Sequence, residues 1–422
     1  MKLTGKYEHK NVYIVSILSR ICSVVIGLIY SILLARYLGT ELRGQLSYVN
    51  SITTVTVIVF SFGVHQAYPY YKKNGRDNIA KKYNHVCILL FLFQCVIAGS
   101  VAYTLYAKLM DQRVIIAVLL TPILVVTKLI TYQMMVENPN KKNYWEVICE
   151  ALEVIALVFL LLFSDKNLIY VLAVIIIKNA MACIYYLKYL KFDIYVEKSD
   201  FGFLKEIMVF GFFPMLSLLM NNLNYRVDII MLGNSVADSQ IGIYSVGIQI
   251  AERVWLVSEA MRDVLFSKLV NGKDIEEVNK VIRICFTISL IVVIGIIVLG
   301  RPFINICYGK EYLDAYYPLI IVLSGTLVMV FYKIIQAYNN VHKKQKLNFW
   351  FLFISVLVNI LLNACLIPLR GVIGAAIASL ISYIVCATLF VVEYLYSTKS
   401  KFESILFINK NDVVAIKQII SH

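Results

Sequence analysis

Long apolar stretches separated by short polar turns repeat along the whole chain. A helix needs about 20 apolar residues to cross the hydrocarbon core of a bilayer, which is roughly 30 Å thick, and the sequence supplies twelve such stretches. They are residues 12–36, 45–68, 85–106, 114–136, 144–164, 168–187, 206–232, 241–266, 284–300, 315–337, 348–367 and 372–396. The pattern predicts an all-α polytopic membrane protein with about twelve transmembrane helices.

The loops between these stretches carry their positive charge mainly on one side. With the N-terminus in the cytoplasm, the cytoplasmic segments hold 25 of the 40 Lys and Arg residues, and the outside loops hold 7. This skew follows the positive-inside rule, so both termini are expected in the cytoplasm. The first apolar stretch is too long for a signal-peptide core and lacks a small-residue cleavage site, so we expect it to remain as the first helix.

The composition supports a membrane protein. The chain is 60% hydrophobic and 16% charged, with a mean hydropathy of +0.76, whereas soluble domains are about 45–50% apolar and about 25% charged. The net charge of +14 lies mostly in loops expected to face the cytoplasm, so we expect no nucleic-acid partner. The nine cysteines show no CxxC spacing and are expected to be small buried hydrophobes.

Two pairs of segments resemble one another at an offset of about half the chain. Residues 121–145 and 326–350 align without a gap and share seven identities, which include Lys128 with Lys333. Residues 38–49 and 232–247 both begin with Leu-Gly and later carry a Tyr close to a Ser. Two parallel six-helix lobes would explain both pairs, and the alternative is chance similarity between apolar helices. We therefore predict an N-terminal lobe over 1–200, a C-terminal lobe over 201–397 and a cytoplasmic tail over 398–422.

Several charged side chains fall inside the predicted spans. A central Arg or Lys costs roughly 3 kcal/mol on insertion scales, so each one needs a cavity, a partner or a function. At 1.5 Å per residue, Arg20, Lys178, Arg253 and Glu252 lie about 12–18 Å from the nearer helix end. Another group lies nearer the cytoplasmic side, where long side chains can reach the interface: Lys128, Lys333, Glu150, Glu259 and Arg262.

Polar residues form one stripe on each of two predicted helices. The stripes comprise Ser16, Arg20, Ser23, Gly27 and Tyr30 in the first span, and Ser217, Asn221, Asn224 and Asp228 in the seventh. We expect both to face a cavity between the halves. The alternative is ordinary helix packing through small and hydrogen-bonding residues.

The charged groups of the eighth span leave a similar choice. Glu259 could pair within its helix with Arg262, three residues later. Arg253 could be balanced by Glu252 or by Asp228, or it could remain unpaired and hold an anion.

Enzyme motifs are missing from the sequence. It contains no GxxxxGK[ST], HExxH or GxSxG pattern and no paired Cys and His cluster. We therefore expect a protein that is not an enzyme and that needs no cofactor or metal.

Three stretches resemble a known family: ILLARYLGTELRGQLSYV, NYRVDIIMLGNSVADSQIGIYSVG and YGKEYLDAYYPLIIVL. They are similar to the Wzx-type polysaccharide repeat-unit flippases of the multidrug/oligosaccharidyl-lipid/polysaccharide exporter superfamily. The resemblance implies a MATE-like, two-lobed transporter of the bacterial inner membrane. It would move undecaprenyl-diphosphate-linked oligosaccharides outward by alternating access, for O-antigen or capsule synthesis. Implied partners are the lipid-linked oligosaccharide, membrane lipids, and polymerase and chain-length proteins of the same pathway.

The intramembrane charges then receive hypothetical roles. We expect Arg20, Lys178 and Arg253 to bind the diphosphate, and Lys128 and Lys333 to guide it in from the cytoplasmic side. Asp228, Glu252 and Glu150 are candidates for a gate or for ion coupling.

Two other functions remain open at this point. A cation-coupled multidrug exporter of the same superfamily should have an acidic cavity. A membrane glycan polymerase or ligase should have a sizeable extracytoplasmic loop, and the longest outside loop here is residues 301–314.

Overall fold

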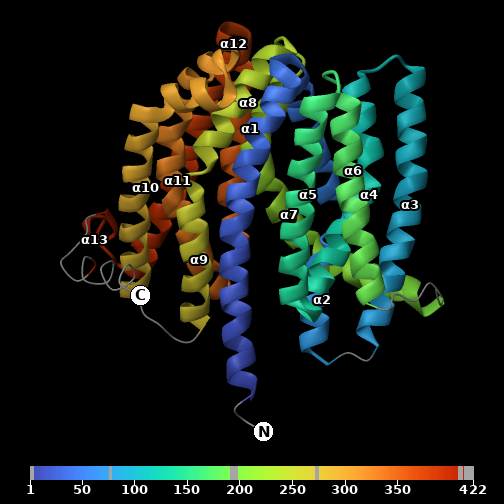
Figure 1. Ribbon diagram of the computed structural model, residues 1–422. Helices are drawn as coiled ribbons and strands as arrows, with labels where there is room; N and C mark the ends of the chain where they lie inside the picture. The colour runs from blue at the N-terminus through green and yellow to red at the C-terminus, as the bar shows by residue number, and fades with distance from the viewer. Residues whose placement is uncertain (1–3, 76–77, 191–197, 271–274, 407–411, 413–422) are drawn as a thin grey trace. The chain divides into compact units, whose positions relative to one another are not determined.

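The computed structural model describes residues 4–75, 78–190, 198–270, 275–406 and 412. Every element in these ranges is a helix (Figure 1). The chain divides into two compact units, Met1–Leu219 and Met220–His422. The first and second unit are described separately below.

The first unit is built around α4. The helices of this unit are α1 (Thr4–Phe60), α2 (Val64–Lys73), α3 (Ile79–Ala107), α4 (Gln112–Glu137), α5 (Pro139–Phe163), α6 (Leu168–Tyr189) and the first part of α7 (Lys198–Leu232). Helix α4 packs against α1, α2, α3, α5 and α6, and α1 also packs along α5. The side chains of α1, α5 and α6 are thereby brought together within this unit.

Helix α1 contains the first predicted span and most of the second. The direction of the helix changes at Gly39, whose φ of 70° lies in the left-handed region that glycine adopts without a steric penalty. The predicted second span is wrong at its end, because α1 stops at Phe60 and α2 begins at Val64. Phe62 and Gly63 both have positive φ there, so the chain turns before residue 68.

A glycine pair fixes this turn against α7. A Cβ on Gly63 would overlap the backbone carbonyl of Gly211, and a Cβ on Gly211 would overlap the carbonyl oxygen of Phe62. The two backbones therefore approach more closely than any side chain would permit. Tyr70 of α2 also stacks on Phe210 of α7, with ring centroids 4.7 Å apart.

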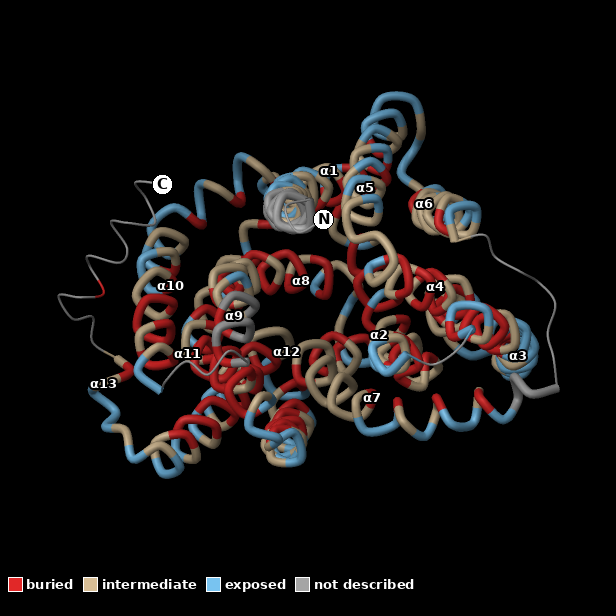
Figure 2. Tube along the Cα trace, turned by 90° about the horizontal axis from the view of Figure 1, so that it is seen from below, coloured by how far each residue is buried: buried red, intermediate tan, exposed pale blue. Residues whose placement is uncertain are grey.

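The second unit is built around α11. Its elements after α7 are α8 (Asp238–Glu252), α9 (Trp255–Val270), α10 (Ile275–Phe303), η1 (Ile304–Tyr308), η2 (Lys310–Ala315), α11 (Tyr316–Val341), α12 (Gln345–Thr398) and α13 (Glu403–Leu406). Helix α11 packs against α8, α9, α10 and α12, and Figure 2 shows buried residues along it. Helix α12 contains the last two predicted spans and changes direction at Gly371, whose φ is 53°.

The predicted eighth span is two helices rather than one. Between α8 and α9, the amides of Arg253 and Val254 bond to the carbonyls of Ile250 and Ala251, three residues back. These tighter bonds replace the four-residue bonds of an α-helix. The break leaves Glu252, Arg253 and Trp255 at a discontinuity inside the span.

The described helices agree with a multi-pass membrane protein. Eight of them are long and apolar enough to cross a bilayer. Counting α1 and α12 twice, and adding α5 and the α8–α9 pair, gives the twelve predicted segments. Large apolar side chains are exposed along α5, where Ile155, Phe159 and Leu162 are each more than 60% accessible. Such surface is suited to lipid.

The predicted cytoplasmic tail lies largely outside the described residues. Helix α12 ends at Thr398, and the short α13 follows. Asp412 is buried and accepts two hydrogen bonds from the Arg283 guanidinium of α10, at 2.6 and 2.9 Å.

Candidate functional site

The first unit contains a cavity of about 300 Å³ between α1, α5 and α6. The side chains that line it are Ile26, Gly27, Tyr30, Glu150, Glu153, Ile175 and Lys178. Two residues of the predicted sites, Lys178 and Glu150, thus lie in one cavity.

Lys178 does not stand alone in this cavity. Its Nζ donates to Oε2 of Glu153 at 2.8 Å, and the Glu153 side chain is 7% exposed. Tyr30 also hydrogen-bonds with Glu153. The ammonium charge is therefore matched by a carboxylate of the neighbouring helix, and the predicted role of Lys178 toward a diphosphate would require that carboxylate to be displaced.

Glu150 is the second carboxylate of the cavity. It hydrogen-bonds with Ser23 of α1, while its Oε2 is buried and has no hydrogen-bond partner. Two carboxylates and one ammonium give the cavity an excess of negative charge. A buried, unsatisfied oxygen of this kind costs about 1–3 kcal/mol, so it marks a position where a proton or a small cation would be stabilised.

The polar stripe of α1 faces α5 within the first unit. Besides the Ser23–Glu150 contact, Ser16 accepts a hydrogen bond from Asn143 at 3.0 Å. Gly27 and Tyr30 continue the stripe into the cavity. Arg20 belongs to the same helix, and its side chain is exposed.

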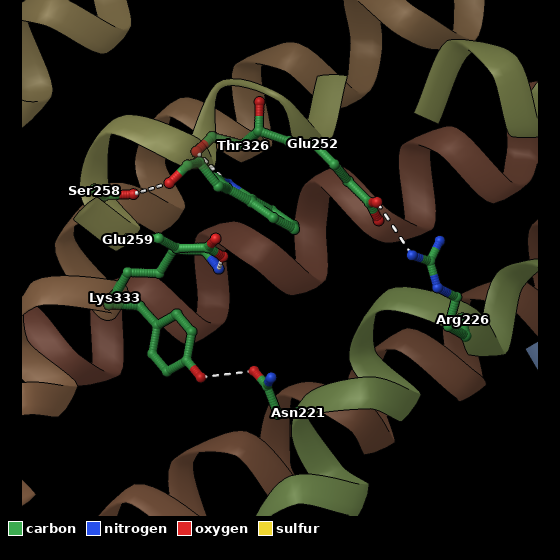
Figure 3. A network of polar contacts seen from close by, with 9 residues as sticks. Asn221, Arg226, Glu252, Ser258, Glu259, Thr326 and Lys333 are labelled. Carbon is green, nitrogen blue, oxygen red and sulfur yellow. Dashed lines mark hydrogen bonds and ion pairs between the residues drawn. The ribbon is translucent and has the colours of Figure 1, made fainter. Parts of the chain in front are cut away.

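In the second unit, Lys333 of α11 lies in a cage of protein groups. Its Nζ donates to Oε1 of Glu259 at 2.9 Å and lies 4.3 Å from the centroid of the Trp255 ring. Trp255 is held in turn by the carbonyl of Thr326 at 3.0 Å (Figure 3). Glu259 thus pairs across to Lys333 of another helix.

Glu252 pairs with Arg226 rather than with Arg253. Nη2 of Arg226 on α7 donates to Oε2 of Glu252 at 3.2 Å, and the two side chains point toward one another in Figure 3. Oε1 of Glu252 is buried without a partner. Arg253 lies half-buried at the α8–α9 break, and no ion pair to it occurs within the described part of the chain.

Asp228 is buried within the second unit against α8 and α12. Its Oδ2 accepts from the Tyr244 hydroxyl at 2.5 Å and from Ser379 at 3.2 Å. One turn earlier, the side-chain oxygen of Asn224 accepts a hydrogen bond from the Ser355 hydroxyl. The backbone carbonyl of Asn224 accepts another from the side-chain amide of Asn359. The end of the predicted α7 stripe therefore packs into polar residues of its own unit, which corrects the expectation that it faces a cavity between the halves.

Lys128 of α4 differs from Lys333, its counterpart in the repeat. It is half-buried, and among the described residues no carboxylate pairs with it. Nearby His65 of α2 is 1% exposed, and neither ring nitrogen has a hydrogen-bond partner. The His65 ring contacts Tyr132 at a centroid distance of 4.6 Å.

Sequence reasoning missed several residues of these sites. Glu153 and His65 have no role in the sequence-based hypotheses, although Glu153 is an acid within the predicted span 144–164. Tyr30 enters them only as a member of the polar stripe of the first span. The amides of Asn359 and Asn363, one turn apart in an apolar stretch, were the available signal for the α7–α12 contacts. In the described residues, no group of three or more His, Cys, Asp or Glu side chains is placed to hold a metal ion.

Comparison with curated proteins gives relatives of one kind. A probable low-salt glycan biosynthesis flippase of Haloferax volcanii is 25% identical over 197 residues, which are 45% of this chain and 42% of that protein. The probable flippase AglR of the same organism is 31% identical over 37% of this chain and 35% of its own length. The teichuronic acid biosynthesis protein TuaB of Bacillus subtilis is 24% identical over 44% of this chain and 40% of its own length. The chain spans less than half the length of these relatives.

Comparison with solved structures concerns the fold alone, because the identities are low. The lipid II flippase MurJ, in an inward closed conformation, has a TM-score of 0.71 at 18% identity, with 97% of this chain and 92% of that chain covered. An inward-facing multidrug resistance MATE family transporter of the MOP superfamily has a TM-score of 0.65 at 12% identity, with 89% and 94% covered. The predicted MATE-like fold is confirmed.

The family comparison covers more of the chain than the individual relatives do. The family described as polysaccharide biosynthesis protein matches residues 10–255, more than half of the 422 residues. The chain therefore belongs to the polysaccharide biosynthesis protein family.

Proposed function

We propose that the protein is a flippase, not an enzyme, that moves undecaprenyl-diphosphate-linked oligosaccharide repeat units across the bacterial inner membrane by alternating access. The product would serve surface polysaccharide synthesis, as O-antigen or capsule. Two six-helix lobes, over 1–200 and 201–397, would carry out the movement, with both termini and the tail in the cytoplasm. Polymerase and chain-length proteins are the proposed pathway partners.

Family membership supports polysaccharide synthesis, and the names of the relatives support lipid-linked glycan transport. Two relatives are named as probable flippases, and one as a teichuronic acid biosynthesis protein. The fold is shared with a lipid II flippase. The names of these relatives do not specify the sugar that this chain would carry.

The observation that carries the proposal is the contrast between paired and unpaired cations inside the helices. Lys178, Arg226 and Lys333 each have a carboxylate partner. Arg253, at a helix break, and Lys128 lack one among the described residues. An unpaired cation in a membrane helix is costly and marks a ligand pathway, and a diphosphate is a suitable anion. Arg253 and Arg20 are each proposed to bind the diphosphate, and Lys178 would do so after releasing Glu153.

The membrane potential favours the proposed direction of transport. Moving one negative charge outward from a negative cytoplasm gains about 2.3 kcal/mol per 100 mV. Glu150 and Glu252, each with one buried and unsatisfied oxygen, are proposed to take up a coupling cation. Asp228, which Tyr244 and Ser379 hold in place, would act as a gate or as a further coupling group.

One observation favours a second candidate function. The cavity of the first unit carries two carboxylates and one ammonium, as a cation-coupled multidrug exporter would require, and a MATE transporter shares the fold. Drug sensitivity of a deletion strain would favour that exporter. A polymerase would instead leave single lipid-linked repeat units displayed on the outer leaflet.

The proposal is tested by complementation of a deletion strain. Arg20→Gln and Arg253→Gln should each reduce surface polysaccharide by about 10- to 100-fold, since a charge-assisted contact contributes about 1.5–3 kcal/mol. Lipid-linked single repeat units should accumulate on the inner leaflet. Arg301→Gln, at the exposed end of α10, is the matched control. Unchanged polysaccharide in both the Arg20 and the Arg253 variant, at normal protein levels, would refute the cationic site.

A further inference from the structure

His65 and Lys128 form an unusual pair within the first unit. His65 is in the first turn of α2 and is 1% exposed, and neither of its ring nitrogens has a hydrogen-bond partner in the described part of the chain. Helix α2, which carries His65, packs on α4, which carries Lys128. The positive charge of Lys128 is close enough to interact electrostatically with the His65 ring. Buried polar groups in proteins are nearly always hydrogen-bonded, so this imidazole requires an explanation.

Comparison with its repeat counterpart shows that Lys128 has no carboxylate partner among the described residues. Its counterpart Lys333 has a carboxylate at 2.9 Å, from Glu259, and the Trp255 ring at 4.3 Å. No carboxylate in the described ranges takes that position at Lys128. The repeated lysine is thus paired with a carboxylate in the second unit, whereas in the first unit it has no carboxylate partner among the described residues.

The groups around Lys128 are suited to an anion. Tyr132 lies one helical turn after Lys128 on α4, so the two side chains share a face. Tyr132 also contacts His65 edge to face, with centroids 4.6 Å apart. The ammonium, the phenol and one imidazole N–H are all donors. Lys128 and Tyr132 are half-buried, which leaves part of each accessible to a ligand.

We propose that Lys128, Tyr132 and His65 form an anion subsite in the first unit that takes a phosphate group of the lipid-linked substrate. This rests on the proposed function and deepens it, because it assigns uptake of the anion to Lys128 alone of the repeated lysines. Lys333 is excluded, because its side chain is only 6% exposed and is held by both Glu259 and the Trp255 ring. Lys178 is 33% exposed, so it could release Glu153. The phosphate oxygens would accept hydrogen bonds from the ammonium and from one N–H of the buried imidazole.

Binding to the purified full-length protein in detergent micelles tests the subsite. The probe is undecaprenyl diphosphate, with undecaprenol as the lipid that lacks phosphate. Lys128→Met should weaken binding of the diphosphate lipid by about 10- to 100-fold and leave binding of undecaprenol unchanged. Lys333→Met should bind the diphosphate lipid within about threefold of the parent, because a difference below roughly 0.7 kcal/mol indicates no lost contact.

A second variant controls for misfolding. His65→Glu would place a carboxylate beside Lys128, as Glu259 is placed beside Lys333, so the variant should keep the parent's melting temperature and lose diphosphate binding. If folded Lys128→Met and His65→Glu both bind like the parent, the subsite is wrong and the flippase proposal stands. If the parent shows no preference for the diphosphate lipid over undecaprenol, both proposals fail together.

Discussion

Three intramembrane cations are each paired with a carboxylate from another helix: Lys178 with Glu153, Arg226 with Glu252, and Lys333 with Glu259. Desolvation makes such pairs weak sources of net stability, yet removing one partner is costly because a buried charge is left alone. Sequence spacing suggests a partner inside one helix for Glu259. The partner Lys333 lies 74 residues away along the chain, so only the tertiary fold could reveal this pair.

The Lys333–Glu259 pair yields a stability prediction with an asymmetry. The Lys333 side chain is 6% exposed and that of Glu259 is 30% exposed. Glu259→Gln should therefore cost about 3 kcal/mol, since it strands the more buried charge, whereas Lys333→Met should cost about 1 kcal/mol. The double variant should recover most of the loss. Thermal unfolding in detergent measures this order, and a Glu259→Gln protein that melts like the parent would contradict it.

At the scale of elements, close backbone contact between α7 and the α1–α2 turn predicts a sharp response to one methyl group. Gly211→Ala would push a Cβ into the backbone of Phe62 and Gly63, which cannot move aside as a side chain could. We expect a loss of about 1–3 kcal/mol, the usual cost of overpacking. Gly99→Ala in α3 meets nothing within 4 Å and should be neutral or gain up to about 1 kcal/mol. Equal melting temperatures for the two variants would show that the contact is not tight.

The apolar pattern predicted the helical segments well, because burial in lipid demands long runs that are easy to see. The apolar pattern did not predict the positions where helices bend or break. At Gly39 and Gly371, a single left-handed residue redirects a helix without a loop. The sequence around the break after Glu252 contains no Gly or Pro that would predict it. It coincides with contacts to other helices, from Glu252 to Arg226 and from Trp255 to Thr326.

At the scale of the whole molecule, the sequence predicted the fold and the family, and both were confirmed by comparison. It also identified candidate charges, but it could not say which of them the protein neutralises itself. That depends on pairings such as Lys178 with Glu153, between helices whose packing no local pattern encodes. Among the residues that the structure describes, the candidate cations without a carboxylate partner inside the spans are Arg253 and Lys128.

Reconstitution into liposomes tests the central claim most directly. The purified protein is placed in vesicles that contain a fluorescent undecaprenyl-diphosphate-linked oligosaccharide, and the appearance of the sugar on the opposite leaflet is followed with an impermeant reagent. We predict rapid translocation by the parent and a rate about 10- to 100-fold lower for Arg253→Gln, while Arg301→Gln behaves like the parent. Translocation no faster than in protein-free vesicles would contradict the account.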